Sequence, residues 1–222
     1  MNILAIVPAR GGSKGIKNKN LALCAGKPLI DWTLEDVDQS SLITRTVLSS
    51  DDEAILSHHR GHQCLPMQRP AEFAQDSTPT EAVIYDVVER CGYDPDIIVL
   101  LQPTSPVRHG RHIDEAIQML DKTGAQSVLS VVPSHAFIWE GPEPFSITYN
   151  WARRPRRQDM PLHFEENGAI YVFTREHWER RHNRIGGKIA LYVMPEEARI
   201  QVDTPFDLWM AGKILESNPW HE

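Results

Sequence analysis

Two short runs of this sequence consist only of aliphatic residues. Residues 3–7 read ILAIV and residues 97–101 read IIVLL. A strand with one face in solvent alternates apolar and polar residues, so an unbroken apolar run of this length predicts a strand covered on both faces. Strands of that kind occur in parallel sheets, which carry helices on both sides. These two runs therefore predict an α/β fold.

Segments with helical and strand patterns alternate along the rest of the chain. Further strands are predicted at 45–49, 127–132, 169–173 and 189–194, and helices at 29–34, 51–60, 80–89, 112–120, 176–181 and 204–215. This βαβα order predicts a mainly parallel sheet with right-handed crossovers. A length of 222 residues suffices for one hydrophobic core, so we expect a single domain over residues 1–222.

Residues 133–166 interrupt this alternation. The segment has no clear helical period, and prolines punctuate it at positions 133, 142, 144, 155 and 161. Proline lacks the N–H that helices and inner strands need, so it marks turns and irregular backbone. We interpret the segment as an inserted flap or a small antiparallel excursion from the sheet.

Charge and composition narrow the class of partner. The chain has 23 basic and 30 acidic side chains, a net charge of −7, which argues against nucleic acid and anionic membranes. The apolar residues after Met1 are too few for a signal peptide, and no stretch approaches the roughly 18 apolar residues of a membrane span. Cys24, Cys64 and Cys91 form no CxxC pair, which is typical of reduced thiols. We therefore expect a cytoplasmic protein.

The connection after the first apolar run, residues 8–20, reads PARGGSKGIKNKN and is rich in glycine and basic residues. Glycines let a backbone approach a ligand closely and direct successive N–H groups at one anion, and cationic side chains add charged donors. The loop lacks the Gly-Lys-Ser/Thr of a Walker loop, and Ser13 stands in place of the second glycine of G-x-G-x-x-G. It is therefore either a polyphosphate-binding loop of another kind, which we favour, or a solvated basic turn.

This loop resembles the nucleotide loop of the acylneuraminate cytidylyltransferases, the CMP-sialic acid synthetases. Further motifs resemble those of the family in the same order: SDD at 50–52, RPAE at 69–72, LQPTSPVR at 101–108, RQDMP at 157–161, ENGAIY at 166–171 and VDTP at 202–205. Together they span nearly the whole chain, which argues against an accidental similarity.

The resemblance implies a three-layer, Rossmann-like nucleotidyltransferase fold, in which segment 133–166 is a dimerisation flap that reaches over the sugar pocket of a second subunit in a homodimer. It also implies an enzyme that couples CTP to a sialic-acid-like 2-keto-3-deoxy sugar acid and releases pyrophosphate, with Mg²⁺ as cofactor. Such a reaction depends mainly on positioning and charge neutralisation. Two alternatives stay open: a non-catalytic protein that binds CTP or a CMP-sugar, and the same reaction on an eight-carbon ulosonate or a diamino nonulosonate.

The motifs carry the family's site residues onto this chain. The resemblance implies that the CTP-binding residues are Ala9, Arg10, Gly11, Gly12, Ser13, Lys14, Lys19, Asn20, Arg69, Thr78 and Thr80. It implies that the sugar-binding residues are Gln102, Thr104, Ser105, Arg157, Gln158, Asn167 and Tyr171, with Arg108 nearby. The residues with an implied catalytic role are Arg10, Lys14, Lys19 and Asp203.

Several of these residues also have a purely structural explanation. Thr80 is equally a candidate for the N-cap of the helix that follows it. Thr104 and Ser105 are common turn residues. Tyr171 lies within an apolar strand, where an aromatic ring fits a core position.

The expected metal site depends on Asp203. The family commonly shows Ile-Asp-Ile-Asp, in which two carboxylates on one strand face share a magnesium ion. This chain reads IQVD at 200–203, so Gln201, a neutral and poorer ligand, stands in place of the first aspartate. We therefore expect Asp203, nucleotide oxygens and water to hold Mg²⁺. Asp207, three residues after Thr204, is expected to cap the last helix instead.

Overall fold

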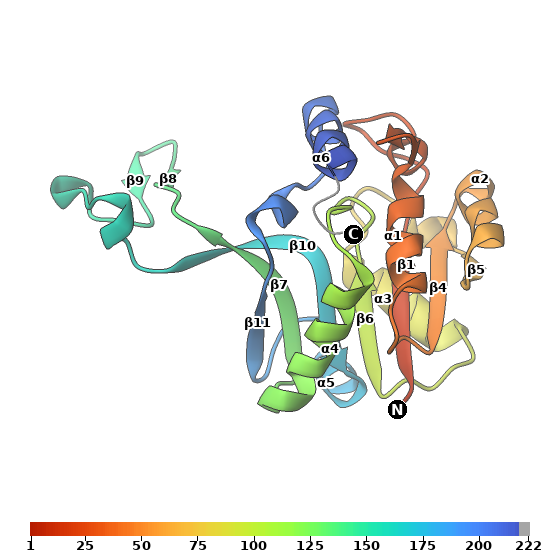
Figure 1. The fold of residues 1–222 in the computed structure, drawn as a ribbon. Helices are drawn as coiled ribbons and strands as arrows, with labels where there is room; N and C mark the ends of the chain where they lie inside the picture. The colour runs from red at the N-terminus through yellow and green to blue at the C-terminus, as the bar shows by residue number, and fades with distance from the viewer. Residues whose placement is uncertain (218–222) are drawn as a thin grey trace.

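Within residues 1–217, which the computed structural model describes, seven strands form one sheet with helices on both faces (Figure 1). The strand order is β11-β7-β10-β6-β1-β4-β5. The strands are β1 (Ile3–Pro8), β4 (Arg45–Ser50), β5 (Leu65–Gln68), β6 (Ile97–Leu101), β7 (Ser127–Ser134), β10 (His163–Thr174) and β11 (Ile189–Val193). The helices are α1 (Leu29–Asp38), α2 (Glu53–Leu56), α3 (Thr80–Arg90), α4 (Gly110–Thr123), α5 (Arg175–Arg181) and α6 (Pro205–Ser217). The predicted α/β fold class is confirmed.

Both faces of strand β1 are buried, as its apolar run predicts. Ile3, Ala5 and Val7 belong to a core that includes side chains of α1 and α4. Leu4 and Ile6 belong to a second core, which includes side chains of α3. Successive side chains of a strand point to opposite faces, so burial on both sides requires an apolar residue at every position.

Strand β10 runs antiparallel to both of its neighbours, β6 and β7, whereas the other pairings in this sheet are parallel. The sheet is therefore mixed and mostly parallel. β7 and β10 are the two arms of a long hairpin, and antiparallel arms need no helical crossover between them. An apolar run does not reveal the direction of a strand, so the sequence pattern alone could not indicate this reversal.

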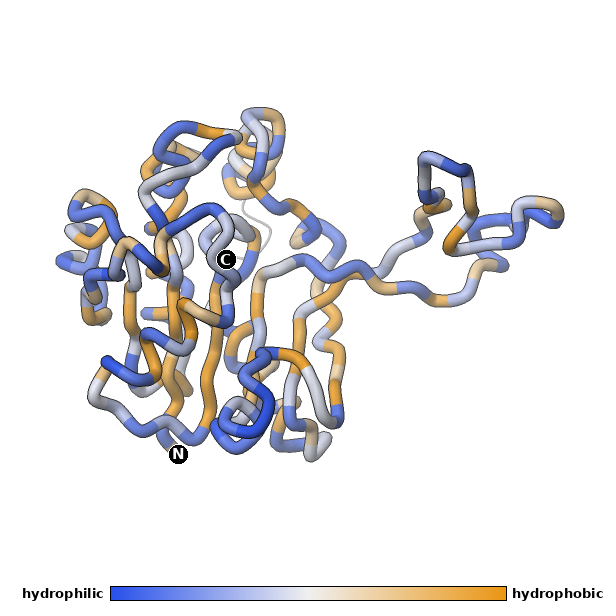
Figure 2. The backbone as a smooth tube through the Cα atoms, turned by 180° about the vertical axis from the view of Figure 1, so that it is seen from behind, coloured by the Kyte–Doolittle hydropathy of each residue, from blue (hydrophilic) through white to orange (hydrophobic). Residues whose placement is uncertain are grey.

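The connection between β7 and β10 projects from the body of the molecule (Figure 1, Figure 2). The chain leaves the sheet after Ser134 and returns at His163, so the ends of the predicted flap of 133–166 lie within the two long strands. The projecting part contains a small antiparallel sheet of β8 (Trp139–Glu140) and β9 (Phe145–Ser146). We use the name flap for residues 135–162.

The flap has a small aromatic cluster of its own. The Tyr149 ring packs edge-on against Phe137, with ring centroids 4.7 Å apart, and its hydroxyl accepts a hydrogen bond from Trp139 Nε1 (2.8 Å). The Arg154 guanidinium lies 4.2 Å from the centre of the Phe137 ring. These contacts give the flap a defined shape away from the main core.

The last helix begins as its sequence predicts. The Asp207 carboxylate accepts hydrogen bonds from the backbone N–H and the hydroxyl of Thr204, both at 2.8 Å. The backbone N–H of Asp207 donates to the Thr204 hydroxyl in return (3.2 Å). This reciprocal cap holds α6 directly after Asp203, at the edge of the sheet where the candidate site lies.

Other helix boundaries differ modestly from prediction. The helix expected at 51–60 divides into α2, which ends at Leu56, and a 3₁₀ turn at Ser57–Gly61. Across the described part of the chain, no helix combines the length and the apolar character that crossing a membrane requires.

Candidate active site

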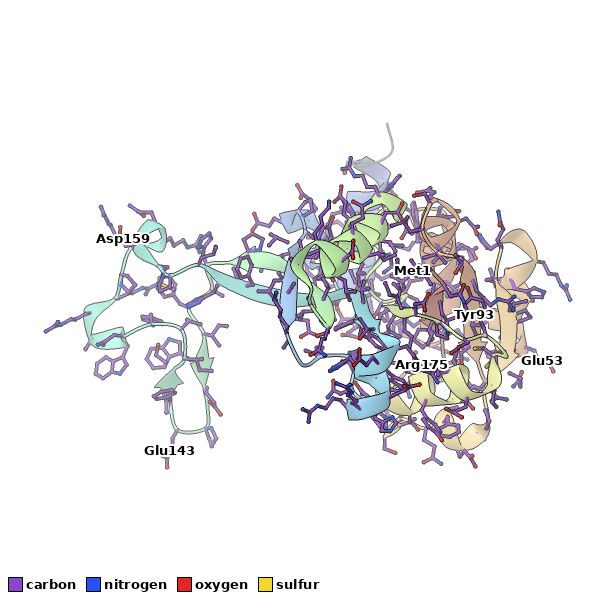
Figure 3. All side chains as sticks on the ribbon, turned by 90° about the horizontal axis from the view of Figure 1, so that it is seen from below. Met1, Glu53, Tyr93, Glu143, Asp159 and Arg175 are labelled. Carbon is purple, nitrogen blue, oxygen red and sulfur yellow. The ribbon has the colours of Figure 1, made fainter. Side chains whose placement is uncertain are left out.

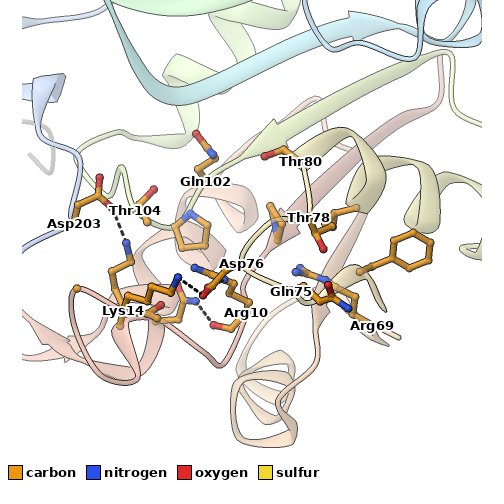
Figure 4. A pocket seen from close by; sticks show the side chains of 18 residues that line it. Arg10, Lys14, Arg69, Gln75, Asp76, Thr78, Thr80, Gln102, Thr104 and Asp203 are labelled. Carbon is orange, nitrogen blue, oxygen red and sulfur yellow. Dashed lines mark hydrogen bonds and ion pairs between the residues drawn. The ribbon is translucent and has the colours of Figure 1, made fainter. Parts of the chain in front are cut away.

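A polar cleft of about 490 Å³ opens where strands β1 and β6 end (Figure 4). The chain passes from β1 to β4 and β5 on one side and then to β6 on the other, so the strand order reverses between β1 and β6. Ligands of open α/β sheets bind at such a point, beside the carboxyl ends of the strands. The residues that line the cleft are Pro8, Arg10, Ser13, Lys14, Gly15, Lys19, Asn20, Arg69, Phe73, Gln75, Asp76, Thr78, Thr80, Val83, Gln102, Pro103, Thr104 and Asp203.

Lys19 is the best-anchored cation of the glycine-rich loop. Its Nζ donates to the carbonyl oxygen of Val202 and to Asp203 Oδ1, both at 2.8 Å, and its side chain is only 14% exposed. Asn20 is buried and donates from Nδ2 to the carbonyl oxygen of Arg10 (2.9 Å). Asn20 therefore shapes the loop that carries the cations, and it also lines the cleft.

Two of the three glycines of this loop, Gly11 and Gly15, are needed for close contacts within the protein, whereas a Cβ atom at Gly12 would meet nothing within 4 Å. A Cβ atom at Gly15 would lie 2.2 Å from the carbonyl oxygen of Asp203, and one at Gly11 would lie 2.7 Å from Asp52 Oδ2. The Gly11 N–H donates to Asp51 Oδ1 (3.0 Å). The expectation that successive glycine N–H groups all point at the ligand is therefore wrong for Gly11.

Asp76 is a cleft residue that the sequence reasoning missed. Its two carboxylate oxygens form ion pairs with two cations of the glycine-rich loop: Oδ1 with Arg10 Nη1, and Oδ2 with Lys14 Nζ at 2.7 Å. Hydrogen bonds from Lys14 and then Arg10 hold the pKa of this carboxyl below its usual value. A signal was available, because Asp76 follows shortly after the RPAE motif at 69–72, but nothing local indicated its partners.

The opposite wall of the cleft carries three more of the residues implied for CTP: Arg69, Thr78 and Thr80. Arg69 is buried and donates from Nε to the Ser49 hydroxyl (3.1 Å) and from Nη2 to the Ser49 carbonyl (2.7 Å). Burial lowers the pKa of this guanidinium. Thr78 and Thr80 line the same wall, as does Phe73, which the sequence reasoning did not identify.

The alternative role of Thr80 as a helix cap is wrong. Thr80 is the first residue of α3, and Pro79 occupies the N-cap position. The Thr80 side chain lines the cleft instead.

Near Gln102, one of the residues implied for the sugar acid, two amide groups converge over a glycine. A Cβ atom at Gly168 would lie 2.8 Å from Gln102 Oε1 and 2.9 Å from Gln201 Oε1, and Gly168 has a φ of +67°. The pairing of β10 with β7 shifts register between Glu166 and Tyr171, around this glycine. The irregularity brings β10 close to the turn after β6, and only glycine leaves room there for both amides.

Four predicted contact residues lie inside the protein rather than in the cleft. Asn167 is 1% exposed, and its Nδ2 donates to the Ala198 carbonyl oxygen (3.0 Å). Ser105 is 1% exposed and donates to the Asn167 carbonyl oxygen (2.9 Å). Tyr171 packs in the core beside α3, with its hydroxyl bonded to Glu166. Ala9 is fully buried. None of the four lines the cleft, and the hydrogen bonds and packing described here give each a structural role, whereas their predicted contacts with substrate stay predictions.

Arg157 and Gln158 lie in a 3₁₀ turn of the flap, Arg157–Asp159. Figure 3 shows Asp159, the last residue of this turn, at the outer part of the flap, far from the body of the same chain. Both predicted sugar-binding residues are exposed and neither lines the cleft of its own chain.

Asp203 provides the carboxylate expected for a metal ion. Its side chain is 74% exposed, and one of its oxygens pairs with Lys19. Mg²⁺ is commonly held by one or two carboxylates together with substrate phosphates and water, so this donor set fits the ion. Gln201 is turned to the Glu166 carbonyl oxygen, to which its Nε2 donates (3.2 Å). Among the residues described, no group of three or more His, Cys, Asp and Glu could hold a metal.

Comparison with known proteins shows which family this chain belongs to. A family model described as Cytidylyltransferase matches residues 4–203. The chain is 38% identical over 213 residues to N-acylneuraminate cytidylyltransferase B of Danio rerio, covering 91% of this chain and 49% of that protein. It is 30% identical over 239 residues to CMP-N,N'-diacetyllegionaminic acid synthase of Legionella pneumophila, covering 98% of both chains.

Among solved structures, CMP:2-keto-3-deoxy-manno-octonic acid synthetase complexed with CTP is similar in fold, with a TM-score of 0.71 and 17% identity over 98% of this chain and 99% of that one. The chain spans about half the length of the N-acylneuraminate cytidylyltransferases that it matches. The family prediction made from the motifs is confirmed. Because the family model matches residues 4–203 and the Legionella relative is 30% identical over 98% of both chains, this chain belongs to the cytidylyltransferases, a family of nucleotidyltransferase enzymes.

Proposed function

We propose that this protein transfers the cytidylyl group of CTP to a sialic-acid-like 2-keto-3-deoxy sugar acid. The anomeric hydroxyl of the sugar acid would attack the α-phosphorus, the new O–P bond would replace the bond to the β-phosphate, and pyrophosphate and the hydroxyl proton would leave. The observation that carries this proposal is the cleft itself. It places cations from the glycine-rich loop opposite Arg69 and Thr78, with Gln102 and Thr104 on the remaining side.

The cations suit the charge that develops in this reaction. A triphosphate brings several negative charges, and the leaving pyrophosphate gains one more as its bond breaks. Arg10, Lys14 and Lys19 lie along one wall of the cleft, where they would offset that charge. Lys19 is the most restrained of the three, because it is anchored to Val202 and Asp203 on the neighbouring segment. A restrained donor loses little entropy when it binds a phosphate.

Mg²⁺ fits the same site as the proposed cofactor. Asp203 and oxygens of the nucleotide would hold it, and when bound it would neutralise negative charge on the phosphates. The Lys19 ammonium beside Asp203 would compete with the ion for that carboxylate. Weak affinity in the absence of nucleotide is therefore part of the proposal.

The flap supports a proposed homodimer in which Arg157 serves the neighbouring subunit. An arginine fork matches the carboxylate of a sugar acid, yet in its own chain Arg157 lies away from the cleft. The flap also exposes large apolar side chains, which stable subunit interfaces cover. These side chains are Ile138, Trp139, Phe145, Ile147, Trp151 and Leu162.

The free thiols of Cys24, Cys64 and Cys91 support a reducing, cytoplasmic setting.

Incubation with CTP, Mg²⁺ and a panel of 2-keto-3-deoxy acids, read by pyrophosphate release, tests the function. The panel should include a nine-carbon sialic acid, a diamino nonulosonate and an eight-carbon ulosonate. The diamino acid is included because one relative is named for that class. We expect release with at least one nine-carbon acid. Tight CTP binding without release at saturating Mg²⁺ would favour a non-catalytic binding protein, and failure to bind CTP would refute both.

A further inference from the structure

The side chain of Arg108 is fully buried, although the sequence places it near the sugar pocket. Its Nη1 donates to three backbone carbonyl oxygens: Gln102 at 3.1 Å, Ser105 at 2.9 Å and Ala169 at 3.1 Å. Its Nη2 donates to the Thr33 hydroxyl. One nitrogen therefore joins both ends of the turn after β6, Gln102 and Ser105, to strand β10 at Ala169, the residue after Gly168.

The charge of Arg108 is met by Asp36, which is also buried. Nε of Arg108 and Oδ2 of Asp36 lie 3.2 Å apart and form an ion pair, but the contact between them does not meet the geometry of a hydrogen bond. Burial raises the pKa of the Asp36 carboxyl, and Arg108 opposes that shift. Asp36 thus neutralises charge, whereas the carbonyl oxygens and Thr33 set the orientation of the guanidinium.

The turn that Arg108 holds is a structural link between two parts of the cleft. It begins at Gln102 and includes Thr104, both of which line the cleft. The Thr104 carbonyl oxygen accepts a hydrogen bond from the Val202 N–H (2.7 Å), next to Asp203. A second link joins the Ser105 hydroxyl to the backbone of β10. Gln102 follows β6, whereas the glycine-rich loop with its cations follows β1. A shift of the turn after β6 would therefore move Gln102 relative to those cations.

We propose that Arg108 is a positioning residue for the sugar-acid half of the site. It fixes the turn 102–105 so that the Gln102 amide meets the acceptor sugar at the distance the reaction needs. This inference depends on the proposed function insofar as Gln102 faces the sugar acid. A displacement of about 1 Å in such a group can reduce a rate by about a hundredfold, so the effect on catalysis should exceed the effect on folding.

Two single substitutions separate positioning from stability. Arg108→Lys keeps a buried cation for Asp36, but a single ammonium cannot reach three carbonyl oxygens and Thr33 together. Asp36→Asn removes the charge partner and leaves the carbonyl contacts of Arg108 in place. Both variants should unfold at a lower temperature than the wild type, because each disturbs a buried ion pair.

We expect Arg108→Lys to raise KM for the sugar acid or lower kcat by about tenfold or more, with the Kd for CTP within about twofold of wild type. Asp36→Asn should leave the sugar KM within about threefold at a comparable loss of Tm. Equal effects of the two variants on sugar KM and kcat, or equal factors on CTP and sugar binding, would overturn the proposal and leave a purely structural role.

A second readout does not require turnover. Hydrogen exchange of the Ser105 and Val202 amides, which bond to Gln102 and Thr104, should accelerate in Arg108→Lys relative to amides of β6. Unchanged protection would refute the positioning role even in an active enzyme. If the wild type turns over no sugar acid, the proposed function fails, while the exchange result still decides whether Arg108 holds the turn.

Discussion

Replacing Asp76 by asparagine should tighten the binding of phosphate-bearing ligands. The Asp76 carboxylate forms ion pairs with both Arg10 and Lys14, the cations we assign to the triphosphate. A ligand that uses these cations must first displace the carboxylate, so its apparent Kd equals its intrinsic Kd divided by the fraction of molecules in which the cations are free. Asparagine has nearly the same shape and no charge, so this competition weakens.

The size of the effect follows from exposure. The side chains of Asp76, Arg10 and Lys14 are 44%, 34% and 81% exposed, so both ion pairs are screened by water. An exposed pair typically contributes a factor of about 1.4 to 5 to an equilibrium. Because the two pairs share one carboxylate, they are not independent, and we expect a combined tightening of about threefold to tenfold.

Calorimetric titration with CTP, pyrophosphate and cytidine tests this reasoning. The factor should be similar for CTP and pyrophosphate and near one for cytidine, which has no phosphate. Glu72→Gln removes a charge from the same segment and serves as the control for a general field effect. Because the pKa of Asp76 is lowered, the carboxylate stays ionised and the ratio of wild-type to variant Kd should be flat from pH 5 to 8. Weaker binding of pyrophosphate by Asp76→Asn would refute the competition.

Three further outcomes are expected. Lys14→Ala should lower turnover by two or more orders of magnitude with an unchanged Tm, because it removes charge from an exposed position; near-normal pyrophosphate release would count against the assignment. Gln201→Asp should tighten the apparent Mg²⁺ affinity about threefold to tenfold if Asp203 binds the ion, and an unchanged magnesium titration would contradict that role. Burial lowers the pKa of His112 from 6.5 to about 4. Between those values the unfolded chain binds a proton that the folded chain does not, so stability should fall by about 3 kcal/mol as the pH drops from 7 to 4. His112→Asn, compared by urea unfolding at both pH values, should show a smaller loss; an equal loss would show that other groups cause it.

The layered architecture was largely predictable from local pattern. An apolar residue at every position of residues 3–7 requires cover on both faces, and the structure provides it. The cap of α6 was equally local, since Thr204 and Asp207 lie within one turn. The direction of β10 was not predictable, because parallel and antiparallel inner strands have the same composition.

For the candidate site as well, features within one segment were predictable and contacts between remote segments were not. The sequence by itself determined which family the chain belongs to and that the loop after β1 carries the cations. The residue types of a single segment suffice for both conclusions, because a glycine-rich loop with several lysines is recognisable without knowing which segments it contacts. Only the tertiary structure decided that Asp76 lies on Arg10, 66 residues away, and that Asn167 and Arg108 are buried supports. The physical reason is that charge pairing and burial are properties of two or more remote segments brought together, and no pattern within one segment records its partner.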